Sequence, residues 1–457
     1  MSTTTNTTTA TGGAPGAGLE RTLTLSSVCI IGIAWVTPLV VLATIGIIAH
    51  LSGGSAPTAY ILTLVAMVFT AYSYGRMAQV HHTKSGSAYT YIGEEMSSHL
   101  GFLTGWMILL DYFFIPLVVW LIGAAYLANQ FPAVPMAAWI VAFILPTTLL
   151  NLIGIKTTTR TDYLLVAFQL LVIAIFVALC LAQWAGAPAG PGALEPFYND
   201  GTTFSAIAAA AAVAAYSFIG FDGLTLLTEE TKDPKRTIPR AMIIVVLFFG
   251  VLFITVAWVT QLVHPGAQFA HPASAALGIS RAVGGNLFAA FVLAGLVVGQ
   301  FACGLTIQAG ASRLLFTMGR DGALPAPLAR LSSRGTPVIS IVLIGLAGLI
   351  GLFVDVTTSA SFINFGAFSA FTLVNLAVIA HWLKHRPQRG AAGVFWWVVL
   401  PALGAIVDFY LLCNLDIDAV IVGLIWLVLG IAWLGWITRG FRQPPPKLTF
   451  EEKPELD

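Results

Sequence analysis

Charged residues are scarce in this chain. Only 9% of its 457 residues are Asp, Glu, Lys or Arg, whereas 58% are hydrophobic. A soluble protein of ordinary composition carries about 25% charged residues. So few charges cannot cover a water-exposed surface, so the composition excludes an ordinary soluble protein and indicates a protein embedded in lipid.

Cysteine is rare as well. The four cysteines, Cys29, Cys180, Cys303 and Cys413, lie in apolar segments, and no C-x-x-C pair occurs. We therefore expect no disulfide framework and no metal site of that kind. Phosphate-binding loops and catalytic-triad spacings are also missing. We expect no cofactor, no metal, no nucleic-acid partner and no enzymatic activity.

Long apolar runs fill most of the chain. A membrane-spanning helix needs roughly 20 mostly apolar residues, and twelve such runs can be found. The predicted spans are 23–49, 57–79, 101–129, 134–154, 161–184, 203–228, 240–263, 283–315, 337–357, 361–383, 393–413 and 417–438. The pattern predicts an all-α polytopic membrane protein with one membrane domain, 23–438.

The basic residues predict the orientation. With an even number of spans and the N-terminus inside, every Lys and Arg except Arg281 falls on the cytoplasmic side, as the positive-inside tendency requires. We expect a disordered cytoplasmic tail at 1–22 and a second cytoplasmic tail at 439–457. The N-terminal segment lacks the basic region of a signal peptide, so we expect the first span to be retained.

Four acidic residues lie inside or near predicted spans. A charge in lipid costs at least about 2.5 kcal/mol, so an acid in the middle of a span usually faces an interior site. Asp111 and Asp222 are near the middle of their spans, and we interpret both as functional. Asp355 and Asp408 are nearer to span ends, where we expect solvated interfacial groups.

Two spans contain helix-breaking residues. Gly32 and Pro38 interrupt the first span, and Gly220 and Gly223 interrupt the sixth. Interrupted helices at matching positions in two halves are typical of a transporter with its substrate site near the membrane midplane. The spacing predicts two five-helix repeats, followed by two additional helices.

Several sequence blocks resemble the amino acid–polyamine–organocation (APC) superfamily. They are S-G-S-A-Y-T-Y (85–91), F-I-G-F-D-G with E-E-T-K-D-P-K-R-T-I-P-R-A (218–241), and A-S-R-L-L-F-T-M-G-R-D-G-A-L-P with R-G-T-P (311–337). Stretches 32–39, 67–77 and 105–116 are most similar to bacterial putrescine importers. The resemblance implies a LeuT-type fold with a 5+5 inverted repeat.

The resemblance also implies roles for individual residues. Asp222 falls where related exchangers hold a glutamate implicated in proton-dependent gating, and Tyr216 where they hold a tryptophan that stacks on substrate. Asp111 falls where the related arginine/agmatine exchanger has a gating tyrosine near the substrate. Two positions depart from the family pattern. A-W-V-T-P stands where amino-acid carriers of the family often have a G-S-G, whose backbone N–H groups bind the substrate carboxylate. Gln169 stands where many relatives have a lysine that takes the place of a sodium ion.

These features together favour a cationic substrate. Two carboxylates beside aromatic rings attract ammonium groups by charge and by cation–π interaction, about 0.5–2 kcal/mol each. We expect a proton-coupled importer of putrescine or a related polyamine; a cationic or neutral amino acid permease, proton-coupled or an exchanger, is the alternative. The predicted substrate-binding residues are Trp35, Thr37, Asp111, Tyr112, Tyr216, Ser217, Phe218, Ile219, Gly220 and Asp222.

Asp222 is also the predicted proton carrier, because a low-dielectric site disfavours its charged form. We expect the protein in the cell inner (plasma) membrane, in contact with the lipid bilayer, as a monomer or homodimer.

An intramembrane aspartyl protease, a channel and a sensor are rival functions. The aspartate motifs have the wrong order and spacing for the protease, and no repeat resembles the selectivity filter of a channel. The sequence blocks that resemble the APC superfamily favour a transporter over all three. His81 and His82 are expected to be solvated rather than metal ligands.

Overall fold

The described residues of the computed structural model are 21–82, 87–153, 159–187, 190–332, 335–387 and 390–446. They fold into a bundle of helices without a β-strand, apart from an isolated bridge between Leu23 and Thr231. Most of both predicted tails and part of the 85–91 block lie outside the described residues.

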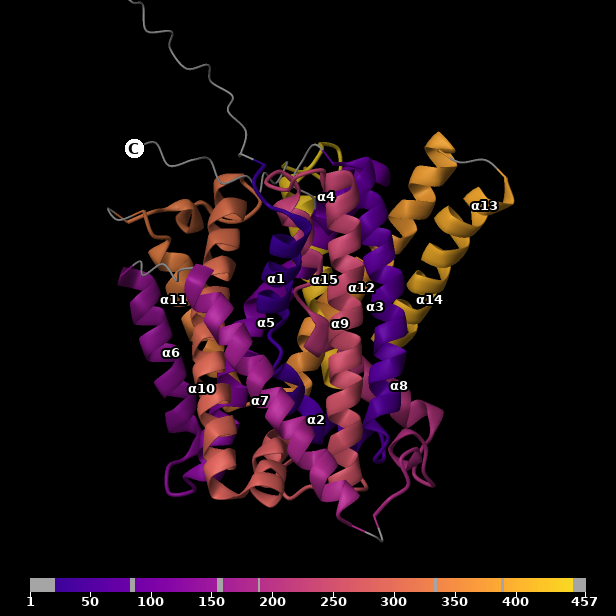
Figure 1. Cartoon of the computed structure of the whole chain (residues 1–457). Helices are drawn as coiled ribbons and strands as arrows, with labels where there is room; N and C mark the ends of the chain where they lie inside the picture. Colours follow the sequence, from indigo (N-terminus) through magenta and orange to yellow (C-terminus); the bar gives the residue numbers. More distant parts are fainter. Residues whose placement is uncertain are drawn as a thin grey trace, which may run out of the picture.

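The bundle is built from long apolar helices that run between its two ends (Figure 1). Together with the short helices α4 and α13, the α-helices of the described residues are α1 Leu25–Val36, α2 Val40–Leu51, α3 Ala56–Val80, α4 Ala88–Glu95, α5 Ser98–Gln130, α6 Met136–Ile153, α7 Thr159–Ala185, α8 Phe204–Ala214, α9 Pro234–Val263, α10 Ala275–Arg320, α11 Val338–Gly348, α12 Val356–His385, α13 Ala391–Val394, α14 Leu400–Cys413 and α15 Ile417–Ile437. Short 3₁₀ turns η2 Ala215–Phe218, η3 Asp222–Thr228 and η6 Leu349–Leu352 continue α8 and α11.

Ten helical segments in the described part of the chain are long and apolar enough to cross a membrane, or eleven if the bent pair α1 and α2 forms one span. The predicted span 337–357 corresponds to α11 with η6, a shorter apolar segment, Val338–Leu352. The chain is therefore a multi-pass membrane protein by length and composition. The prediction of twelve spans exceeds this number and stays a prediction.

The long helix α5 lies in the middle of the bundle. It packs against α10 and α12, and 78% of its most apolar stretch is buried, against 17% for α15. The helix α3 packs along α9 on one side of this centre. Residues carried by α5 and by the inner halves of neighbouring helices are therefore shielded from the bilayer, which makes α5 a suitable position for a buried acid.

Candidate functional site

The first predicted interruption is present as a sharp bend. The axes of α1 and α2 differ by 52°, and between them Thr37 has a φ of 65°. Pro38 cannot donate a backbone hydrogen bond, and the next amide, Leu39 N, donates to Gln169 Oε1 at 3.1 Å. Gln169 lies on α7 and is buried. A side chain from another helix therefore satisfies a donor that the break releases.

The second predicted interruption follows α8. The helix tightens into η2, passes through Gly220 at a φ of 117°, and resumes as η3 at Asp222. Asn364 on α12 donates from Nδ2 to the carbonyl oxygen of Ala212 at 2.7 Å. Only glycine readily adopts this φ. Both interruptions are thus supported by a buried amide side chain from a distant helix.

The two interruptions touch each other. A Cβ at Gly220 would lie 3.3 Å from the backbone carbonyl of Trp35, and a Cβ at Gly223 would lie 3.0 Å from the Trp35 ring. Trp35 itself is 40% exposed. The glycines therefore serve two purposes: they allow the unwound backbone and they let the end of α1 approach it closely.

Asp111 lies on α5, beside these breaks. It is 7% exposed, and its Oδ1 atom is buried without a hydrogen-bond partner. Gly366 on α12 leaves the space that this carboxylate occupies, since a Cβ there would collide with Oδ1. A buried acceptor without a partner is uncommon in proteins, and among the described carboxylates Asp408 shares this feature through its Oδ1.

Asp222 begins η3 and is partly buried. Backbone amides of Gly220 and Gly223 hydrogen-bond to its carboxylate. Asp111 lies close enough to Asp222 for the two carboxylates to interact electrostatically. The side chains of Tyr74 and Tyr112 lie close enough to interact with both. The tertiary structure therefore gathers two carboxylates from separate helices in a setting rich in tyrosine, suitable for one or two ammonium groups.

The remaining predicted site residues divide into two groups. Thr37 hydrogen-bonds with Cys303 of α10, and Tyr216 lies within electrostatic reach of the same thiol, so both sit near the breaks. Ser217 instead joins a buried hydroxyl cluster, with its Oγ 3.3 Å from Thr44 and 3.4 Å from Tyr60.

Phe218 packs edge-on against Phe253 at 5.1 Å between ring centres, and Ile219 is partly buried. The contacts of Ser217 and Phe218 thus fix η2 against its neighbours α2, α3 and α9. A role for these two side chains in substrate binding stays a prediction.

The two acids near span ends differ from each other. Asp355 is exposed and caps α12 by accepting from Thr358 N at 2.7 Å, as expected for an interfacial group. Asp408 is fully buried and accepts from Thr70 at 2.7 Å and from Asn375 at 2.9 Å. The expectation of a solvated Asp408 is wrong because α14 turns this face toward α3 and α12.

Several residues near the breaks were not singled out by the sequence. Tyr74 is buried with edge-on contacts to Phe221 and Phe371, and Asn364 supports the end of α8. The signal for Asn364 was available, because an amide in an apolar span needs a hydrogen-bond partner on another helix; Asn375 gives the same signal in the same span. Tyr74 had no such signal, since aromatic residues are common in membrane spans.

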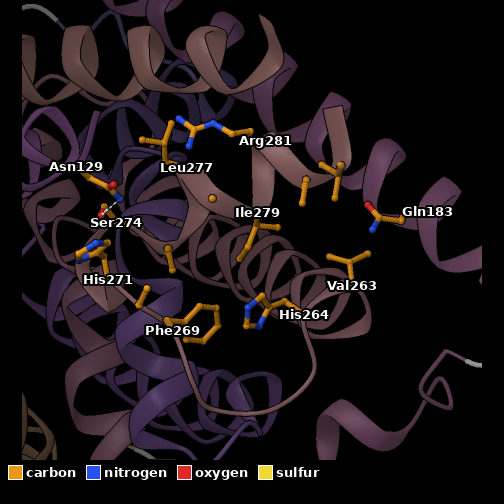
Figure 2. Close-up of a pocket in the computed structure, with 15 residues that line it drawn as sticks. Asn129, Gln183, Val263, His264, Phe269, His271, Ser274, Leu277, Ile279 and Arg281 are labelled. Atoms are coloured by element: carbon orange, nitrogen blue, oxygen red, sulfur yellow. Dashed lines mark hydrogen bonds between the residues drawn. The ribbon is translucent and has the colours of Figure 1, made fainter. Parts of the chain in front are cut away.

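A cavity of about 300 Å³ lies elsewhere in the molecule (Figure 2). Its lining comes from the ends of α5 and α9 and the start of α10, and includes Asn129, His264, His271 and Arg281. None of the predicted site residues belongs to this lining. The cavity is thus separate from the group around Asp111 and Asp222.

A bundle of long apolar helices with two touching interruptions and buried carboxylates is typical of a membrane transporter. The sequence model of the amino acid permease family matches residues 27–443. The chain therefore belongs to this family, within the APC superfamily. The relatives below are permeases rather than enzymes, in agreement with the expectation from the sequence.

Three relatives illustrate the range of the family. The low-affinity putrescine importer PlaP of Escherichia coli (strain K12) is 34% identical over 435 residues, covering 94% of this chain and 96% of the relative. The branched-chain amino acid permease BcaP of Bacillus subtilis (strain 168) is 28% identical, with 90% and 92% covered. The methylthioribose transporter of the same organism is 26% identical, with 90% and 92% covered.

Proposed function

We propose that this protein is a secondary active transporter that imports a small organic cation, with putrescine or a related polyamine as substrate. The observation that carries the proposal is Asp111, a buried carboxylate with an unpartnered oxygen, within electrostatic reach of a second carboxylate, Asp222. A diamine carries one ammonium group for each acid. The similarity to a putrescine importer supports the same substrate class.

An amino acid is the alternative substrate, and the similarity to a branched-chain amino acid permease supports it. An amino acid carboxylate would need free donors at the first break. The Leu39 amide beyond Pro38 already donates to Gln169, which leaves one donor fewer for such a carboxylate. This hydrogen bond favours an amine without a carboxylate.

Proton coupling is assigned to Asp222 in this proposal. Asp222 lies two residues after Gly220, where the backbone departs from helical geometry, and it is less buried than Asp111. Rotation of η3 about this point would change the exposure of Asp222 and thereby its tendency to hold a proton. Alternating access would then couple proton movement to substrate movement.

The proposed architecture has twelve spans arranged as a 5+5 inverted repeat plus two helices, with both termini in the cytoplasm. The first break and the second break are five spans apart in this arrangement, and their mutual contact supports a shared site. We place the protein in the inner (plasma) membrane as a monomer or homodimer.

Uptake into proteoliposomes tests the proposal directly. Labelled putrescine should accumulate when the interior is alkaline and the exterior acidic, and an excess of unlabelled putrescine should compete. Leucine and arginine should compete weakly. Competition by amino acids but not by diamines would overturn the choice of substrate and leave the assignment to the permease family intact.

A further inference from the structure

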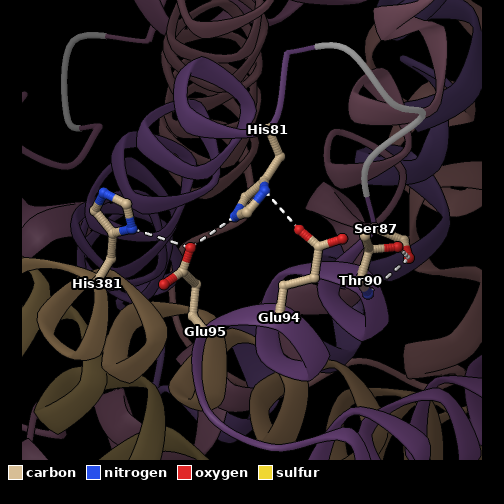
Figure 3. A network of polar contacts seen from close by, with 6 residues as sticks. All are labelled: His81, Ser87, Thr90, Glu94, Glu95 and His381. Atoms are coloured by element: carbon tan, nitrogen blue, oxygen red, sulfur yellow. Dashed lines mark hydrogen bonds and ion pairs between the residues drawn. The ribbon is translucent and has the colours of Figure 1, made fainter. Parts of the chain in front are cut away.

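Histidine and glutamate side chains form a cluster that joins three helices at the end of the bundle where α4 lies (Figures 1 and 3). Glu95, the last residue of α4, is 3% exposed. Its Oε1 atom lies 2.8 Å from His81 Nε2 and 3.0 Å from His381 Nδ1. Because His81 is thus held between helices, the expectation that it is solvated is wrong.

His385 completes the cluster from one turn further along α12. Residues four apart lie on the same face of a helix, and the rings of His381 and His385 stack at 4.5 Å. The Nδ1 atom of His385 donates to the carbonyl oxygen of His381 at 3.2 Å. That hydrogen bond places the proton on Nδ1 and leaves the Nε2 lone pair available, the arrangement found in metal-binding histidines.

The donor atoms are close enough to share one ion. One atom each from Glu95, His381 and His385 can be chosen so that all lie within 4.8 Å of one another. Ligands at the 2.0–2.2 Å bond lengths of zinc lie about 3.4 Å apart in a tetrahedron. Side-chain shifts of about 1 Å would close the site, and three protein ligands leave a fourth position for water.

The local charge also favours a cation. Both α4 and α12 end at this site, at Glu95 and at His385, and the C-terminal end of a helix carries partial negative charge. Glu94 adds a second carboxylate, 2.8 Å from His81 Nδ1. The opposing groups are Lys384, whose Nζ donates to the backbone carbonyl of Glu95, and His81, whose two ring nitrogens face Glu94 and Glu95.

We propose that Glu95, His381 and His385 form a binding site for a divalent transition-metal cation of the zinc type, which ties α4 to α12. Imidazole and carboxylate together suit such ions. The ion takes the place of the proton between His381 Nδ1 and Glu95 Oε1, and the neutral imidazole then carries its one proton on Nε2. The site is separate from the two aspartates, so the proposal does not depend on the transported substrate.

The test uses the purified full chain, freed of any polyhistidine tag, and titrates it with ZnCl₂ in a calorimeter. The wild type should bind one ion per chain. His385→Gln should bind at least about tenfold more weakly, since even outer-shell changes cost 10–100-fold. This variant keeps the hydrogen bonds of Glu95, and thermal unfolding without metal verifies that it remains folded.

His271→Gln is the matched control, because His271 is exposed and lines the cavity of Figure 2, outside the cluster. It should bind zinc as the wild type does. Cobalt provides a second readout: a strong visible absorption of tetrahedral Co²⁺ should appear in the wild type and disappear in His385→Gln. Equal zinc affinity of the wild type and His385→Gln, or no binding by the wild type, would overturn the proposal.

Discussion

At the scale of single residues, the same side-chain type has different roles in different surroundings. Asp355 caps α12 at the surface, and Asp408 is fully buried, with its Oδ2 accepting from Thr70 and Asn375 and its Oδ1 without a partner. Asp111 has a buried oxygen with no partner, and Asp222 is bound by the backbone of the break. What distinguishes Asp111 and Asp222 from Asp408 is their position, because these two carboxylates interact with each other and Asp222 lies in the second break.

Asp111→Asn should weaken putrescine binding by at least about tenfold, equivalent to about 1.4 kcal/mol, because it removes one of two negative charges. Calorimetric titration of the purified protein measures the change. Asp355→Asn is the control: asparagine is also a good N-cap, so binding and folding should stay as in the wild type. Unchanged affinity in Asp111→Asn would refute a direct role.

Asp222→Asn should abolish accumulation driven by a pH gradient while exchange of internal for external putrescine continues. The amide cannot carry a proton, yet it keeps the size of the side chain. The measurement compares both activities in the same proteoliposomes, with a protonophore as the control for the gradient. Accumulation at the wild-type rate would rule out Asp222 as the proton carrier.

At the scale of elements, the interrupted helices depend on other helices for their stability. Gln169 from α7 satisfies the amide of Leu39 after the first break, and Asn364 from α12 satisfies carbonyls before the second. Free backbone groups in lipid cost several kcal/mol each. The breaks are therefore parts of the packed bundle and not local kinks.

Gly220→Ala should destabilise the protein by about 1–3 kcal/mol, the usual cost of strained backbone, because alanine disfavours a φ of 117° and its Cβ would meet Trp35. Thermal unfolding measures this change. Gly278→Ala is the control: this exposed position in α10 has no neighbouring atom within 4 Å. Equal stability of the two variants would contradict the described break.

Gln169→Met keeps the volume of the side chain but leaves the Leu39 amide without its acceptor. The variant should lose about 1–3 kcal/mol of stability, the cost of an unsatisfied buried donor. Denaturant or thermal unfolding measures the loss. Gln268→Met, at an exposed loop position, should change stability little. If both variants unfold alike, the hydrogen bond contributes nothing.

At the scale of the whole molecule, the distribution of basic residues bears on how the bundle is oriented in the membrane. The basic residues predict that the starts of α1 and α9 face the cytoplasm and that the loop between α9 and α10 faces outward. The bridge between Leu23 and Thr231 joins the starts of α1 and α9 at one end of the bundle. That contact is compatible with the prediction.

Single cysteines introduced into a chain lacking Cys29, Cys180, Cys303 and Cys413 test this orientation. Gln268→Cys should react with a membrane-impermeant maleimide added to intact cells, whereas Arg442→Cys should react only after the membrane is opened. Both positions are exposed, so the difference reports the side of the membrane. The reverse pattern would show that the termini face outward.

The sequence by itself determined the class of this protein. Low charge and long apolar runs require lipid as the solvent, and Pro38 and Gly220 mark the positions where a helix cannot continue, because these constraints act locally along the chain. The burial of Asp408 and the histidine cluster at Glu95 could not be predicted. Each depends on which faces of separate helices meet, and only tertiary packing decides that.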